Sequence, residues 1–295
     1  MMDVAASPSV RRYARELGID IARLGEELQS DTVTRRDVER KAAGGGVPAT
    51  DAASLYWEVD HAQYGPVSDE PVPRREQVAA ANLAAAQALI PAVTHHDRAE
   101  IAGIEAARTR LKPLAEAAGV RLTALAFHVK ALARTLALYP RFNASLSPDG
   151  TRLVIKHYCH VGIAVDTPHG LMVPVVRNAD RKGLLSIAAE IGALAARARD
   201  RKLRSQEMGG ASMSITNLGG IGGTGFTPIV NPPEVAILGL CRSETVPVWT
   251  GEAFEPRLMV PLALSYDHRV INGADAARFL AHYARLLAEP ARLLL

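Results

Sequence analysis

Apolar residues recur at helical spacing in four long segments, 99–119, 122–140, 183–200 and 273–288. The apolar side chains that share one face of the first segment are Ile101, Ile104, Leu111 and Leu114. Gly119 follows it as a helix C-cap. The second segment is apolar on nearly all sides, which predicts a buried helix ended by Pro140.

Shorter apolar runs between these segments predict strands. Residues 160–178 predict two strands around a turn at Thr167–Gly170. Further strands are predicted at 211–220, 233–241 and 257–266. Helices and strands that alternate along residues 62–295 predict one continuous α/β domain.

Residues 7–42 predict a small helical unit. Ser7 is placed to cap a helix with Pro8 at its first position, and Thr34 is placed to cap a second short helix. A unit of about 36 residues buries little apolar surface, so we expect it to be marginally stable without a partner. Residues 43–61 contain a run of glycines and predict a flexible linker.

The composition narrows the class of protein. The 295 residues are 48% hydrophobic and 22% charged, and a net charge of +3 is too small and too dispersed to suggest nucleic acid binding. No run of about 18 apolar residues is present, so no membrane span is expected. The N-terminus lacks the apolar core of a signal peptide, which predicts a cytoplasmic protein. Cys159 and Cys241 lie in apolar segments, where we expect reduced, buried thiols.

A glycine run at residues 219–225, GGIGGTG, matches the dinucleotide-binding pattern GxGxxG letter for letter. That pattern binds a pyrophosphate where a helix follows it, since the helix N-terminus holds the phosphates. Here Pro228, Pro232 and Pro233 follow, and no helix can begin among them. The run therefore predicts a loop and not a nucleotide site.

Two clusters contain residue types that bind metals, His95–Asp97 and His157–His160. Neighbouring residues on a strand point to opposite faces, so neither cluster converges on one ion. We expect no metal site here.

The segment SYDHRVINGAD, residues 265–275, places Asp267, His268 and Arg269 between a predicted strand and a predicted helix. A single histidine in such a place is more often structural. This one has charged neighbours on both sides, and Asn272-Gly273 makes the turn into the helix. A histidine held in this way can accept a proton near pH 7 as a general base.

Several blocks of the sequence resemble the dihydrolipoamide acyltransferases, the core components of 2-oxo acid dehydrogenase complexes. DHRVINGADAARF resembles their DHRxx[DN]G signature, and ITNLGG resembles their [ST][NS]LG segment. The resemblance covers residues 62–295 and is closest to pyruvate-type members with cubic cores, while residues 7–42 resemble their peripheral subunit-binding domain. It implies an α/β fold of the chloramphenicol acetyltransferase type, a mixed sheet with flanking helices in two layers.

The resemblance also implies roles for individual residues. His268 would be the general base that takes the proton of an incoming thiol or hydroxyl, and the hydroxyl of Thr216 would stabilise the oxyanion of the tetrahedral intermediate. Asn272 stands at the place of a family Asp or Asn. The active site would lie between subunits of a homotrimer, with coenzyme A or acetyl-CoA as co-substrate. Two alternatives stay open, a Thr216 hydroxyl bonded within its own strand and an Asn272 that only serves the turn.

Three departures from the family matter. No lipoyl domain, and so no lipoyl attachment site, is found in this chain. The segment LGEELQSDTVT stands where the family has a Gly-rich basic loop, although Arg11 and Arg12 remain, and this argues against docking of a dehydrogenase. The entry to the first helix of the large domain is shortened, and there Arg74 and Arg75 are candidates for contact with a CoA phosphate.

The C-terminal segment EPARLLL resembles the apolar tail that joins trimers in cubic cores. Leu293, Leu294 and Leu295 would be exposed on a monomer, so we expect assembly beyond a trimer, to a 24-mer.

These observations favour a stand-alone acyltransferase that moves an acyl group, acetyl in the first place, from acyl-CoA to a small hydroxyl-bearing acceptor. Related enzymes act in natural-product biosynthesis, such as the tetronate pathway. The alternative is the dihydrolipoamide acyltransferase component of a pyruvate-type dehydrogenase complex that uses lipoyl groups from another chain. A third hypothesis is a scaffold that has lost the chemistry.

Overall fold

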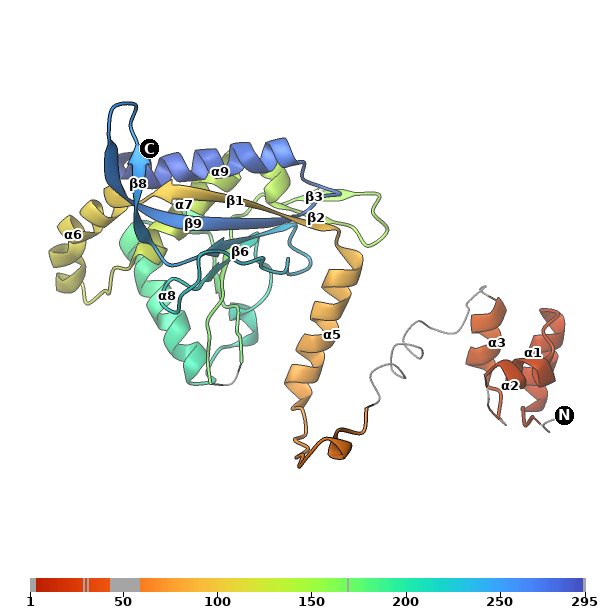
Figure 1. Ribbon diagram of the computed structural model, residues 1–295. Helices are drawn as coiled ribbons and strands as arrows, with labels where there is room; N and C mark the ends of the chain where they lie inside the picture. The colour runs from red at the N-terminus through yellow and green to blue at the C-terminus, as the bar shows by residue number, and fades with distance from the viewer. Residues whose placement is uncertain (1–3, 29, 31, 43–58, 169, 294–295) are drawn as a thin grey trace. The chain divides into compact units, whose positions relative to one another are not determined.

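The computed structural model describes residues 4–28, 30, 32–42, 59–168 and 170–293. By its internal contacts the chain divides into two units, residues 1–71 and 72–295 (Figure 1). Each unit has a hydrophobic core of its own. Most of the predicted linker, residues 43–58, lies outside the described residues.

The described residues of the N-terminal unit contain three short α-helices, α1 (Pro8–Glu16), α2 (Ile21–Glu27) and α3 (Arg35–Ala42). Ser7 caps α1 as predicted, because its side chain accepts a hydrogen bond from the amide of Val10. The sequence pattern did not indicate α2, which Asp20 caps by accepting from two amides of its first turn. Seven buried side chains form the core: Val4, Val10, Ala14, Ile21, Leu24, Val33 and Val38.

The larger unit contains a mixed sheet, in which seven strands of the described residues follow the order β1-β9-β7-β6-β4-β5, with β8 paired to β9. The strands are β1 (Ala92–Glu100), β4 (Val161–Ile163), β5 (Val175–Val176), β6 (Met213–Asn217), β7 (Ala236–Leu240), β8 (Glu244–Trp249) and β9 (Phe254–Asp267). The pairs β4–β6 and β6–β7 are parallel, and the other pairs are antiparallel. Strands β2 (Ala144–Leu146) and β3 (Leu153–Ile155) form a separate hairpin.

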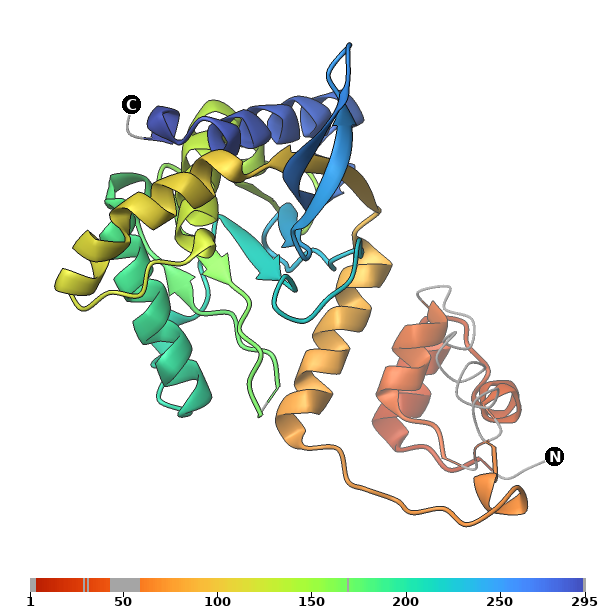
Figure 2. The ribbon, with the colours of Figure 1, turned by 60° about the vertical axis from the view of Figure 1, so that its left-hand side comes forward.

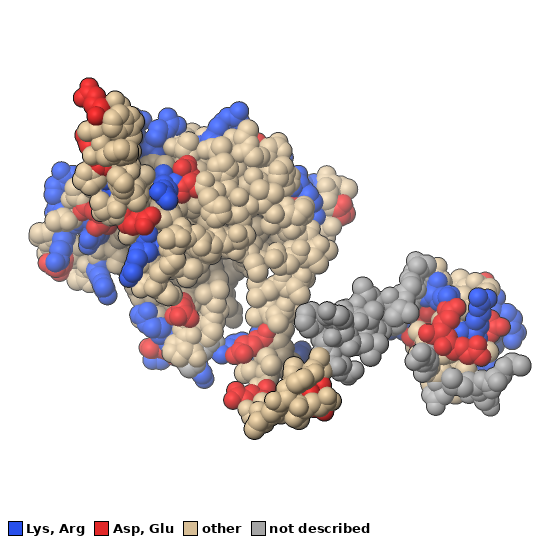
Figure 3. Space-filling view, in the orientation of Figure 1, with Lys and Arg blue, Asp and Glu red and all other residues tan. Residues whose placement is uncertain are grey.

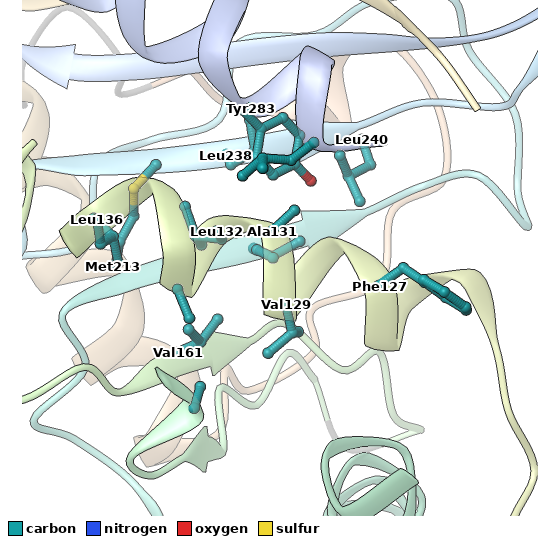
Figure 4. Packing of buried hydrophobic residues seen from close by; sticks show 14 of the residues in the cluster. Phe127, Val129, Ala131, Leu132, Leu136, Val161, Met213, Leu238, Leu240 and Tyr283 are labelled. Atoms are coloured by element: carbon teal, nitrogen blue, oxygen red, sulfur yellow. The ribbon is translucent and has the colours of Figure 1, made fainter. Parts of the chain in front are cut away.

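Helices pack on one face of this sheet (Figures 1 and 2). They are α6 (Ala102–Ala117), α7 (Ala124–Leu138), α8 (Leu184–Arg199) and α9 (Gly273–Ala288). Figure 4 shows Val129 and Leu132 of α7 beside strand residues of the same core, among them Leu238. The α/β class and the mixed sheet with flanking helices are therefore confirmed. Among the described residues, no helix has the length and apolar composition needed to cross a bilayer.

The opposite face of the sheet carries the glycine-rich loop. Phe226 fills the space that Gly239 leaves open, since a Cβ at Gly239 would lie 2.7 Å from the Phe226 ring. Farther along, Ile90, Val230 and Ile237 form a small buried cluster. The loop is thus held against β7 at two places.

Helix α5 (Arg74–Leu89) is largely exposed and packs little against the described residues of its own unit. Of its sixteen residues only Ala86 is buried, and Leu83 and Leu89 are 50% and 68% exposed. Strand β1, which follows α5, leaves Val93 exposed as well. In Figure 3 a largely uncharged surface extends over β1, β9 and the C-terminal half of α5.

Two expectations about individual residues were wrong. Leu114, placed on the inward face of its helix, is 59% exposed, while Ile104 of the same helix is fully buried. Leu293, expected to be exposed at the C-terminus, is 4% exposed and belongs to the chain's own core. Leu294 and Leu295 lie outside the described residues.

Inside the core, His128 of α7 meets Tyr283 of α9. The imidazole Nδ1 lies 2.6 Å from the Tyr283 hydroxyl, so the two share a hydrogen bond. Burial lowers the pKa of His128 from 6.5 to about 4 and raises the pKa of Tyr283 well above 10. Both side chains are therefore neutral in the folded protein near pH 7.

This pair makes folding sensitive to acid. The His128 pKa is depressed on folding, so below pH 6.5 the unfolded chain takes up a proton that the folded chain refuses until about pH 4. We expect this residue to lower the free energy of unfolding by roughly 3 kcal/mol as the pH falls through that window. Urea unfolding of the wild type and of a His128→Gln variant at several pH values measures it. The variant should show a flatter dependence between pH 6.5 and 4, and equal slopes would contradict the assignment.

Candidate active site

The turn at residues 267–272 follows β9 and leads into α9. Asp267 is buried, and its carboxylate accepts three kinds of hydrogen bond from Arg269: from the amide at 3.0 Å, from Nε at 3.0 Å and from Nη2 at 2.7 Å. The same contact raises the pKa of Arg269. The carbonyl of Asp267 also accepts from the amides of Val270 and Ile271. The two charged neighbours of the histidine thus fold the backbone of the turn.

His268 sits on this turn with an exposed side chain. Its amide donates to the carbonyl of Pro91 at 3.1 Å, and its ring lies 5.8 Å from the ring of Tyr266. Neither imidazole nitrogen hydrogen-bonds to any residue within the described part of the chain. Backbone contacts therefore determine where the imidazole stands, and both of its nitrogens are available to a substrate or to another chain.

Asn272 is the N-cap residue of α9, with φ −90° and ψ 156°. Its carbonyl accepts from the amides of Asp275 and Ala276, but its side chain makes no capping hydrogen bond. Asparagine at this position usually accepts from the first turn. The exposed amide of Asn272 is instead left for other contacts, four residues after His268.

Thr216 lies near the end of β6 and is partly exposed. Its neighbours Met213 and Ile215 point into the core, and because side chains alternate along a strand, Thr216 points to the opposite face of the sheet. On that face it stands beside Gly239, the residue that Phe226 covers. The Thr216 hydroxyl has no hydrogen-bond partner among the described residues, so the alternative of a locally bonded hydroxyl finds no support.

The sheet topology separates Thr216 from His268 within one chain. Strand β9 runs antiparallel to β7, while β6 runs parallel to β7, so the carboxyl ends of β6 and β9 lie at opposite ends of the sheet. Thr216 pairs across the sheet with Gly239 of β7, and Gly239 pairs with Ala263 of β9. Ala263 precedes His268 by five residues. Strand spacing then puts the two residues about 10 Å apart across the sheet and about 16 Å apart along it. They cannot act on the same atom within one chain.

Arg74 and Arg75 form the first turn of α5, at the end remote from β1. A helix of sixteen residues places them about 24 Å along its axis from Pro91, the residue that contacts His268. Both are exposed, and Arg75 pairs with Glu76 at 3.6 Å. The structure does not bring these arginines to the other predicted residues of the same chain.

The structure also describes the other sequence candidates, the two histidine clusters and the glycine run. Neighbouring residues of the His95–Asp97 cluster alternate between the two faces of β1, and His160 accepts a hydrogen bond at Nδ1 from the amide of Asn178. No group of three or more His, Cys, Asp or Glu side chains in the described residues is arranged to hold a metal ion. After the glycine run the next element is β7, so the prediction of a loop is confirmed.

Arg141 was not predicted from the sequence. Its guanidinium donates two hydrogen bonds to the carbonyl of Val270, within the turn that carries His268. The two residues are 129 positions apart, and no local pattern connects them. Co-variation between these positions in related sequences would be the signal to search for.

Comparison with known proteins identifies the family. Residues 64–295 match the model of the 2-oxoacid dehydrogenases acyltransferase (catalytic domain). The chain belongs to this family. A second model, the E3 binding domain, matches residues 4–26.

Curated relatives are similar to this chain over nearly its whole length. The dihydrolipoyllysine-residue acetyltransferase component of the pyruvate dehydrogenase complex of Pseudomonas aeruginosa is 48% identical over 301 residues, covering 99% of this chain and 55% of the relative. The Azotobacter vinelandii component is 46% identical over 302 residues, covering 99% of this chain and 47% of the relative. The chain thus spans about half the length of these relatives.

Two solved structures share the fold of this family member, each with 52% identity and a TM-score of 0.79, covering 80% of this chain and 98% of the other. One is the cubic core of the pyruvate dehydrogenase multienzyme complex. The other comes from crystallographic and enzymatic work on the role of a serine, a histidine and an asparagine in the catalytic mechanism of Azotobacter vinelandii dihydrolipoamide acetyltransferase. In that enzyme the serine precedes the histidine by 52 residues and the asparagine follows it by four.

The Asp267–Arg269 pair should support the turn in solution. We expect Asp267→Asn to lower the free energy of unfolding by about 1–3 kcal/mol, because it weakens hydrogen bonds from a charged donor to a buried acceptor. Urea unfolding measures this. Asp275→Asn is a matched control, since its pair with Arg278 is largely exposed and should change stability by less than about 1 kcal/mol. Equal effects of the two substitutions would contradict the assignment.

Proposed function

We propose that this chain is the acetyltransferase component of a pyruvate-type dehydrogenase complex and moves acetyl groups between a dihydrolipoyl thiol and coenzyme A. The observation that carries the proposal is a matching spacing. Thr216 precedes His268 by 52 residues and Asn272 follows it by four, the spacing of the serine, histidine and asparagine studied in the Azotobacter vinelandii enzyme.

The local geometry suits these roles. The exposed His268 imidazole takes the proton of the attacking thiol, and the resulting sulfur attacks the carbonyl carbon of the acyl thioester. The Thr216 hydroxyl donates to the oxyanion of the tetrahedral intermediate, as a serine hydroxyl would. When the intermediate collapses, the leaving thiolate receives the proton from His268. The free side-chain amide of Asn272 lies on the same turn and can hydrogen-bond to the substrate or the imidazole.

Each active site would take its parts from two chains. Thr216 and His268 lie at opposite ends of the sheet in one chain, so a complete pair needs His268 from one subunit and Thr216 from the next. The exposed apolar residues of α5 and β1, with the uncharged surface around them, support burial against another subunit. A homotrimer, further assembled into a cubic core like that of the similar solved structure, is the arrangement we propose.

The relatives favour the second of the sequence hypotheses over the first. Those described above are acetyltransferase components of pyruvate dehydrogenase complexes, and none of them supports a hydroxyl acceptor from natural-product biosynthesis. The match to an E3 binding domain also supports dehydrogenase partners, which the altered loop had argued against. In this unit Arg12 is exposed, whereas the Arg11 side chain donates to the backbone of Val4 and Ala6.

Acetyl transfer from acetyl-CoA to dihydrolipoamide tests the proposed reaction. We expect turnover with this dithiol and little with small hydroxyl acceptors. His268→Ala should lower kcat by about 10²–10⁴, and Thr216→Val should lower it by about 10²–10³, because each removes one catalytic group. Thr216→Ser keeps the hydroxyl and serves as the control, with activity within a few fold of the wild type. Preferred acetylation of a hydroxyl acceptor, or full activity of His268→Ala, would refute the proposal.

Mixed oligomers test whether the site lies between subunits. Co-expression of His268→Ala chains with Thr216→Val chains should restore up to about a quarter of wild-type activity, because some interfaces then combine an intact His268 with an intact Thr216 from different chains. Each variant alone should show only the low residual activity expected above. A pair formed within one chain would leave every mixed oligomer inactive, and that result would contradict the inter-subunit site.

A further inference from the structure

Residues 139–142, which follow α7, pack against α9, the helix that begins after the His268 turn. Phe142, which is fully buried, stacks on Phe279 of α9 with ring centroids 4.1 Å apart. Tyr139 meets the same Phe279 ring edge-on at 5.6 Å, and its hydroxyl donates to the carbonyl of Arg278. Residues 139–142 are therefore fixed to α9 by aromatic contacts on both sides of Arg141.

From this anchored segment, Arg141 reaches the turn itself. Its Nε and Nη2 donate to the carbonyl of Val270 at 3.1 and 2.9 Å. Other contacts to the turn come from backbone groups, since the amides of Asp267 and His268 donate to the carbonyls of Val235 and Pro91. Within the described residues, Arg141 is the side chain from outside the turn that hydrogen-bonds to it.

The position of Val270 gives this contact its importance. Val270 lies between His268 and Asn272, and its amide closes the turn on the carbonyl of Asp267. The imidazole of His268 has no hydrogen bond of its own to the described residues, so the hydrogen bonds that fix its position are those of the turn's backbone, beside the Tyr266 ring. A guanidinium presents two donors in a rigid fork, which restrains one carbonyl more strongly than the single ammonium of a lysine.

We propose that Arg141 is a positioning residue for His268: it holds the carbonyl of Val270 and so keeps the imidazole aimed at the thiol. This rests on the proposed function, because it assigns His268 its catalytic role. A catalytic group displaced by about 1 Å can lose about 10²-fold in rate, and we expect a loss of about 10–10²-fold in kcat when Arg141 is removed.

The test compares Arg141→Met and Arg141→Lys with Arg121→Met in the assembled protein. Arg121 is an exposed arginine at the other end of α7 and controls for the loss of a surface charge. Steady-state kinetics with acetyl-CoA and dihydrolipoamide should show the loss in kcat for Arg141→Met with the KM for acetyl-CoA unchanged within threefold. Arg141→Lys should recover part of the rate, and Arg121→Met should behave as the wild type.

Hydrogen–deuterium exchange gives a readout that does not need activity. The amides of Val270 and Ile271 are bonded within the turn, so exchange in a peptide spanning 267–272 should rise by about tenfold in Arg141→Met, while β7 stays protected. If kcat or this exchange is unchanged, or if the melting temperature and the protection of β7 from exchange fall together with the activity, the positioning role is overturned. If the wild type has no acyltransferase activity the proposed function fails, and the exchange still decides whether Arg141 holds the turn.

Discussion

The direction of the strands is the constraint on which the rest of this molecule depends. Because β9 runs against β6 and β7, one sheet delivers Thr216 to one end and His268 to the other. Neither side chain hydrogen-bonds to another described residue, and apolar residues of α5 and β1 are exposed as well. Under the proposed function, each chain therefore contributes half of an active site, and the chemistry requires association of subunits.

The turn at 267–272 is held by hydrogen bonds from its own residues and from residues far away in the sequence. The local parts are a buried carboxylate, an arginine two residues later and a helix that begins directly after the turn. The distant parts are the carbonyls of Pro91 and Val235 and the guanidinium of Arg141. Three distant segments of the chain thus converge on six residues, although the imidazole that they serve makes no hydrogen bond to the described residues.

The sequence predicted what depends on short-range patterns. The buried helix α7, the Ser7 cap and the loop after Gly225 follow from periodicity and from the backbone limits of proline. Patterns failed where tertiary context decides. Strand β1 mixes charged and apolar residues and was not predicted, Leu293 folds back into its own core, and Arg141 acts across 129 residues. The proposed pairing of Thr216 with His268 came from a resemblance, because no local sequence pattern connects two residues 52 positions apart.

The contact between Phe226 and Gly239 has a consequence for redesign of this scaffold. The Phe226 ring occupies the space where a side chain at position 239 would carry its Cβ. A larger residue at 239 therefore requires a smaller one at 226. In the preceding glycine run, a Cβ at Gly220, Gly222 or Gly223 would meet open space. Variant libraries that alter the surroundings of Thr216 should therefore keep Phe226 and Gly239 and vary the preceding glycine run. Gly220 is the first choice, because its φ angle is not positive and other residues can adopt it.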